Sequence, residues 1–121
     1  MHIKKINLAD KLLQFNDHWS PKVVGKLNNH LLKVAKLKGE FIAHKHDDED
    51  EMFLVIKGCL YIELESETLQ LNAGEFTVIP KGVIHKPYAP EEVEVMLLEP
   101  DTVLNTGEIE NDMTVRNLDF I

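Results

Sequence analysis

Only one cysteine, Cys59, occurs among the 121 residues, so the chain cannot form an internal disulfide. Long apolar runs are also missing, since no stretch approaches the roughly 18 apolar residues that a membrane-spanning helix needs. The N-terminus has no apolar segment of the kind that a secretion signal contains. We therefore expect a cytoplasmic protein without a membrane partner, because reduced thiols are typical of that compartment.

Positive charge is scarce as well: 13 Lys and Arg residues stand against 21 Asp and Glu residues, a formal net charge of −8 at pH 7. A nucleic-acid surface needs a basic stripe, and the sequence supplies none, so we predict no nucleic-acid partner. Hydrophobic residues make up 44% of the chain, which is enough for a core. At this length we expect one domain that spans residues 1–121.

Short β-branched and apolar runs alternate with turn residues from about residue 22 to residue 100. Asn28 and Asn29 form a two-residue turn signal between the first two runs, which predicts a hairpin. The predicted strands are 22–27, 30–37, 52–56, 60–64, 68–71, 76–79 and 93–98. Many short strands at close spacing are typical of an all-β sandwich or barrel, so the predicted core is about 22–100.

Two segments flank this core. Residues 7–16 predict a short amphipathic N-terminal helix, with Asn7 as its N-cap and an apolar stripe that covers one face of a sheet. Residues 101–121 form a polar C-terminal tail that ends in the apolar run 118–121. We expect this end to return to the barrel or to reach a second subunit.

The residues with the most distinctive chemistry lie around the predicted strand 52–56. His44 and His46 are two residues apart, so in an extended chain they point to the same side. Glu51 opens the next strand, and His85 follows a turn after strand 76–79. Imidazoles and a carboxylate that converge from adjacent segments suit a divalent transition metal.

These residues stand in two blocks that resemble the two motifs of the cupin family. The first block holds Gly39, His44, His46, Glu51 and Gly58, and the second holds Gly74, Pro80, Gly82 and His85. Gly39 comes one residue late, and Ala89 stands where the family has an asparagine. The resemblance is to small stand-alone cupins of the mannose-6-phosphate isomerase-like kind.

The resemblance implies a double-stranded β-helix, also called a jelly-roll barrel. It also implies a metal site in which His44, His46, Glu51 and His85 bind Fe, Mn, Ni or Zn. Asp50 competes with Glu51 for the carboxylate position, but the spacing to Gly58 and the strand alternation select Glu51. The acidic run 47–51 lacks the glycine and spacing of an EF-hand, so its first residues predict a solvated loop.

The function that this site implies is the binding or conversion of a small oxygenated metabolite, as in cupin dioxygenases and isomerases. The alternative is a binding or sensing module that does not turn its ligand over. Phe53, Val55 and Tyr88 are the candidate pocket residues. Lys33 and Lys36 are predicted to be solvated on the outer face, although one of them could instead reach the interior as a substrate anchor.

Two further expectations follow from the ligand set and from the alternation. Protons should compete with the metal for the three histidines near about pH 6.5. Met52, Leu54 and Ile56 point away from the Glu51 face and need cover, which predicts a homodimer.

Overall fold

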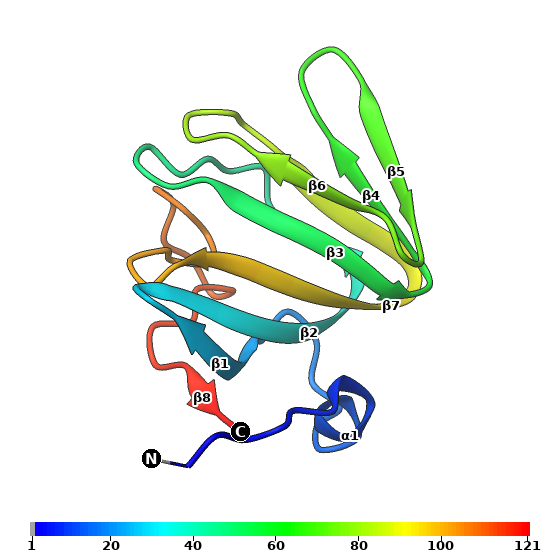
Figure 1. Ribbon diagram of the computed structural model, residues 1–121. Coiled ribbons are helices and arrows are strands. Elements are labelled where there is room, and N and C mark those ends of the chain that lie inside the picture. Colours follow the sequence, from blue (N-terminus) through cyan, green and yellow to red (C-terminus); the bar gives the residue numbers. More distant parts are fainter. Residues whose placement is uncertain (1) are drawn as a thin grey trace.

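The computed structural model describes residues 2–121, which form one short helix and eight strands (Figure 1). The elements in chain order are α1 (Leu8–Leu12), β1 (Lys22–Leu27), β2 (His30–Glu40), β3 (Glu51–Lys57), β4 (Cys59–Glu63), β5 (Thr68–Asn72), β6 (Phe76–Ile79), β7 (Lys86–Pro100) and β8 (Asp119–Phe120). The all-β prediction is confirmed, and the observed architecture is that of a jelly roll.

The long strand β7 organises the sheet. The strand order is β5-β4-β7-β2-β1-β8, and β3 joins through β7 on one side and β6 on the other. The first residues of β7 pair with β4, while its later residues pair with both β2 and β3. Figure 1 shows the result, in which the β4–β5 hairpin and the β3–β6 pair fold over the layer formed by β1 and β2.

The prediction of a strand limited to 93–98 is wrong, because β7 begins at Lys86 and runs through Pro90. The pairing of β2 with β7 shifts between Leu37 and Gly39, where the chain at residues 90–92 bulges out. Pro90 is exposed at this bulge, so its missing N–H removes no ladder hydrogen bond from the strand.

The predicted helix 7–16 is also too long. Asn7 is the N-cap as expected, and its side chain accepts a hydrogen bond from the Asp10 backbone N–H at 3.0 Å. The helix ends at Leu12, its one buried residue, because a single turn has little tertiary contact to propagate it. The Phe15 carbonyl instead accepts a hydrogen bond from Lys36 Nζ.

The first hairpin and the C-terminal run follow the predictions more closely. Leu27 pairs with His30 across Asn28 and Asn29, and Asn28 has a positive φ of 52° as the two-residue turn requires. The C-terminal run returns to its own chain, where β8 pairs in parallel with β1. Lys22 Nζ reinforces this pairing through an ion pair with Asp119 at 3.1 Å.

The interior is filled by alternate residues of the strands. The buried cluster consists of Ala35, Leu37, Phe53, Val55, Leu60, Ile62, Leu71, Ile79, Ala89, Val93, Val95 and Leu97. In β3 the inward residues are Glu51, Phe53 and Val55, so the alternation places the carboxylate on the core face at the end of the strand. Phe76 and Val78 of β6 do not line the interior, since they are 62% and 49% exposed.

Candidate metal centre

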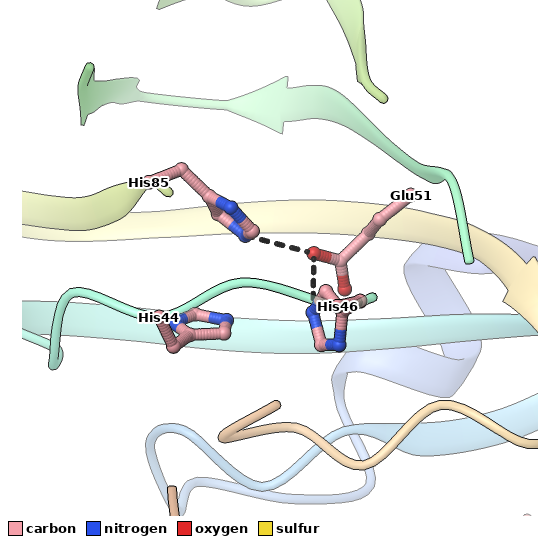
Figure 2. A group of neighbouring side chains, drawn as sticks. All are labelled: His44, His46, Glu51 and His85. Carbon is pink, nitrogen blue, oxygen red and sulfur yellow. Dashed lines mark hydrogen bonds and ion pairs between the residues drawn. The ribbon is translucent and has the colours of Figure 1, made fainter. Parts of the chain in front are cut away.

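The side chains of His44, His46, Glu51 and His85 converge inside the barrel (Figure 2). All four are buried, and one potential ligand atom from each lies within 4.8 Å of the others. Glu51 Oε1 lies 3.3 Å from His85 Nε2 and 3.5 Å from His46 Nε2. The four donor atoms are therefore close enough to share one metal ion.

Backbone hydrogen bonds hold the two motifs together. The His44 N–H donates to the His85 carbonyl at 3.0 Å, and the His85 N–H donates back to the His44 carbonyl at 2.8 Å. The Gly82 N–H donates to the His46 carbonyl at 2.7 Å. The segment around His44 and His46 is therefore not a continuous strand, but this short bridge gives it a fixed position beside the second motif.

The outward ring nitrogens of two histidines are held by carbonyl groups. His44 Nδ1 lies 2.9 Å from the Ile42 carbonyl, and His85 Nδ1 lies 3.0 Å from the Val83 carbonyl. A carbonyl can only accept, so in each ring Nδ1 carries the hydrogen and Nε2 keeps its lone pair. This is the tautomer that binds a metal through Nε2.

His46 supplies a separate test of whether a metal fits here. Within the described chain, its buried Nε2 has no hydrogen-bond partner, because Glu51 Oε1 at 3.5 Å is too distant. Buried polar atoms are rarely left in this state. Three imidazole nitrogens and one carboxylate form a donor set that a divalent transition metal would satisfy.

The protonation states of His44 and Glu51 also suit a bound divalent metal. Burial lowers the pKa of His44 to about 4, so its ring is neutral at pH 7. Without a metal, this imidazole takes up a proton only well below pH 6.5. Burial by itself would raise the pKa of Glu51, but its polar neighbours, with Glu99 first among them, outweigh burial and hold that pKa well below its usual range.

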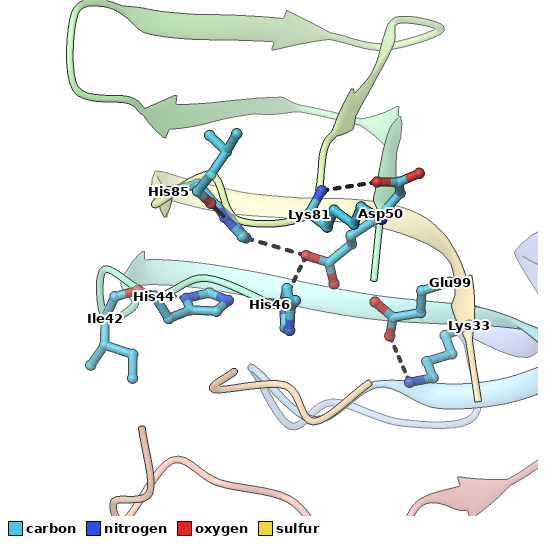
Figure 3. A network of polar contacts seen from close by, with 10 residues as sticks. Lys33, Ile42, His44, His46, Asp50, Lys81, His85 and Glu99 are labelled. Atoms are coloured by element: carbon cyan, nitrogen blue, oxygen red, sulfur yellow. Dashed lines mark hydrogen bonds and ion pairs between the residues drawn. The ribbon is translucent and has the colours of Figure 1, made fainter. Parts of the chain in front are cut away.

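A buried ion pair lies beside the cluster, and the sequence analysis missed it (Figure 3). Lys33 and Glu99 are only 3% and 2% exposed, and Lys33 Nζ lies 2.6 Å from Glu99 Oε1. Burial and the neighbouring Glu51 carboxylate raise the pKa of Glu99 well above its usual range. The prediction that Lys33 is solvated is thus wrong.

Lys36 is buried as well, at 8% exposed, because its ammonium reaches the Phe15 carbonyl and stands over the Phe15 ring. A signal for Glu99 was present in the sequence, since the alternation that starts at Val93 reaches it through Val95 and Leu97.

A cavity of about 40 Å³ adjoins the cluster. Its lining residues are Trp19, Pro21, Leu37, Phe41, His44, Glu51, Phe53, Pro87, Leu97, Glu99 and Asn105. Among the candidate pocket residues, Phe53 lines this cavity, whereas Val55 packs in the core. Tyr88 lies elsewhere: it stacks on Tyr61 with 5.2 Å between ring centroids, because the inward positions of β7 on either side of it are 87 and 89.

Trp19 and Asn105 line the cavity from the segments before β1 and after β7. Trp19 stacks on Phe41 with 4.8 Å between centroids, and its Nε1 donates to the Lys38 carbonyl at 2.8 Å. Asn105 is held by the backbone of Met113 and Val115. Gly107 packs so tightly on the first motif that a Cβ atom there would collide with the Lys45 carbonyl oxygen.

A jelly roll that gathers three histidines and a glutamate from two such motifs is the architecture of the cupin proteins. The family model described as Cupin_2, a cupin domain, matches residues 31–100, and the chain belongs to this family. A search of the described residues finds no helix that is long and apolar enough to cross a membrane.

Particular relatives share this domain. A cupin-2 domain containing protein from Shewanella frigidimarina is 48% identical, with a TM-score of 0.78 over 78% of this chain and 93% of that chain. Protein NMB1881 from Neisseria meningitidis shares the fold at 23% identity and a TM-score of 0.74, over 80% and 99% of the two chains.

The Bacillus subtilis protein YdbB is 38% identical over 64 residues, which are 52% of this chain and 57% of that protein. The chain thus spans little more than half the length of this curated relative.

The ion pair predicts an unequal response to single and double substitution. Lys33→Met leaves Glu99 as a buried carboxyl without its cation, so we expect the free energy of unfolding to fall by about 3–5 kcal/mol. Lys33→Met combined with Glu99→Met leaves no buried charge and should cost little or nothing. Urea unfolding of the metal-free variants measures both, and equal losses in the two variants would contradict the prediction.

The depressed pKa of His44 predicts a pH-dependent stability of the metal-free protein. Between pH 6.5 and about 4 the unfolded chain takes up a proton at His44 that the folded chain does not, so stability falls as the pH falls. This difference corresponds to about 3 kcal/mol. Replacement His44→Gln should remove it in urea titrations across this range, whereas His2→Gln at the exposed N-terminus should keep the wild-type slope.

Proposed function

We propose that this cupin binds a divalent transition metal, one of Fe, Mn, Ni or Zn, through His44, His46, Glu51 and His85. The observation that carries the proposal is the buried His46 Nε2, which has no partner in the described chain and faces three other potential ligands. We further propose that the metal holds a small oxygenated metabolite in the adjoining cavity, as a dioxygenase-like or isomerase-like site.

The charge balance supports an anionic or strongly polar oxygen ligand. Glu51 contributes one negative charge, and the Lys33–Glu99 pair contributes none when both groups are ionised and one positive charge when Glu99 is protonated, which its raised pKa favours. The site with a divalent ion therefore keeps at least about one positive charge, which attracts carboxylate or enolate oxygens. When bound, such a metal would supply Lewis-acid polarisation of the ligand oxygen.

The cavity supports a compact ligand. A volume of about 40 Å³ corresponds to a few water-sized groups at most. Phe53 forms an apolar wall beside the histidines, with 6.1 Å between its ring centroid and that of His85. Val55 packs in the core cluster together with Phe53. Tyr88 stacks on Tyr61 and is not part of the pocket that we propose.

A non-catalytic binding or sensing module is the second candidate, and the placement of Tyr88, Lys33 and Lys36 favours it. An enzyme needs an acid or base besides the metal ligands. Tyr88 and Lys36 lie away from the cavity, and Lys33 is paired with Glu99. Glu99 is thus the group on which a catalytic role would depend.

We also propose that the protein is a homodimer. Two rows of apolar side chains cross the outer face of the sheet from the edge strand β6 through β3 and β7 to β2. The rows are Val78, Met52, Leu98 and Leu32, and Phe76, Leu54, Met96 and Val34. The exposed ends at Phe76 and Val78 would be covered by a second copy.

We further expect that residues 1–121 form a single cupin domain. We also expect a cytoplasmic location and no nucleic-acid partner.

Metal binding is tested on protein purified without an affinity tag. We expect elemental analysis to find one divalent metal per chain, or calorimetry of the stripped protein to give one site. His46→Ala should weaken that affinity by about 100-fold or more, since even outer contacts to ligands are worth about 10–100-fold. His2→Ala is the control, and wild-type affinity in His46→Ala would contradict the proposed site.

The dimer is tested by light scattering of the wild-type chain and of a variant with Phe76→Glu and Val78→Lys. We expect a dimer mass for the wild type and a monomer mass for the variant, because two charges on the edge strand oppose a dry contact. Leu13→Glu, at a side chain that is 82% exposed beside α1, is the control. A monomeric wild type would overturn the proposal.

A further inference from the structure

Glu99 presents one free oxygen beside the metal centre. Lys33 Nζ holds Oε1 at 2.6 Å, while Oε2 is buried and has no hydrogen-bond partner in the part of the chain that is described. The side chain lines the cavity together with His44 and Glu51. In Figure 3 the Lys33 ammonium lies on one side of the Glu99 carboxyl group, and the oxygen that is not bound to Lys33 points back toward the histidines.

The sheet register explains this placement. Met52 of β3 pairs with Leu98 of β7, so the next residues along the two strands, Glu51 and Glu99, are neighbours on the inner face. Lys33 enters from β2, the strand on the other side of β7. The ion pair therefore fixes the direction in which the free oxygen points.

The other groups of the cavity leave Glu99 with a distinct role. Trp19 Nε1 donates to the Lys38 carbonyl, and both polar atoms of the Asn105 side chain are bound to backbone groups. His44 and Glu51 belong to the proposed metal site. The remaining lining residues are apolar, namely Pro21, Leu37, Phe41, Phe53, Pro87 and Leu97. Within the described lining and outside the proposed metal ligands, Glu99 Oε2, which neighbours Glu51, is thus the buried side-chain oxygen without a hydrogen-bond partner.

We propose that Glu99 recognises a hydroxyl group of the ligand, and that the site selects compact hydroxylated molecules such as small hydroxy acids. The inference rests on the proposed function, in which another oxygen of the same molecule meets the metal. A hydroxyl group both donates and accepts, so it satisfies either form of the Glu99 carboxyl. A ligand without it leaves a buried polar atom unpaired and is rejected.

The experiment compares glycolate with acetate, which carries the same charge and carboxylate but no hydroxyl group. Each is titrated by calorimetry into the Zn(II)-loaded protein. We expect glycolate to bind roughly tenfold more tightly or better, the range for a hydrogen bond to a charged group.

The matching variant replaces the ion pair by Lys33→Met and Glu99→Met, which leaves no lone buried charge. Both ligands are titrated into the Zn(II)-loaded form of this variant, so a weaker Zn(II) affinity does not affect the comparison, and we expect its preference for glycolate to fall to about one. The control variant removes the more exposed pair of Lys86 and Glu40, 3.1 Å apart, by Lys86→Met and Glu40→Met, and it should keep the preference.

The outcomes separate this inference from the metal site itself. If the wild type binds none of Fe, Mn, Ni and Zn, the proposed function is wrong and this inference is wrong with it. Metal binding with equal affinity for glycolate and acetate, or with neither bound, would overturn only the role of Glu99. A glycolate preference that persists in the double variant would assign the hydroxyl to the metal and also overturn it.

Discussion

The paired backbone hydrogen bonds between His44 and His85 are the constraint on which the site depends. They join the irregular segment before β3 to the segment that follows β6, so two motifs far apart in the sequence share one position. The remaining ligand geometry follows from this bridge and from the inward face of β3, which begins at Glu51. The rings of His44 and His85 are then oriented by nearby carbonyls and not by a regular strand.

The sequence predicted the features that depend on local pattern. Alternation identified the inward face of β3, and the asparagine pair identified the first hairpin. The four potential ligands were found because their spacing belongs to motifs, and the structure brings their side chains together. The extent of β7 was missed, because a proline that normally ends a strand lies here in an exposed bulge.

What the sequence could not supply depends on partners that are distant along the chain. A lysine in a strand is ordinarily solvated, and only the meeting of β2 and β7 shows that Lys33 has a buried carboxyl group to bind. The stacking of Tyr88 on Tyr61 is of the same kind, since it depends on the pairing of β7 with β4. Local pattern gives the periodicity of a face, and pairing determines what that face meets.

The pairing of β7 with β2, β3 and β4 also has a consequence for cooperativity. His85 immediately precedes this strand and Glu99 lies near its other end, so both ends of one strand return to the same small region. The strands β2, β3 and β4 all form backbone hydrogen bonds with β7, so none of them can detach without disturbing the strand that holds the others. We therefore expect the four candidate ligands to belong to the cooperative unit that unfolds globally, with backbone amides among the most slowly exchanging ones of the chain.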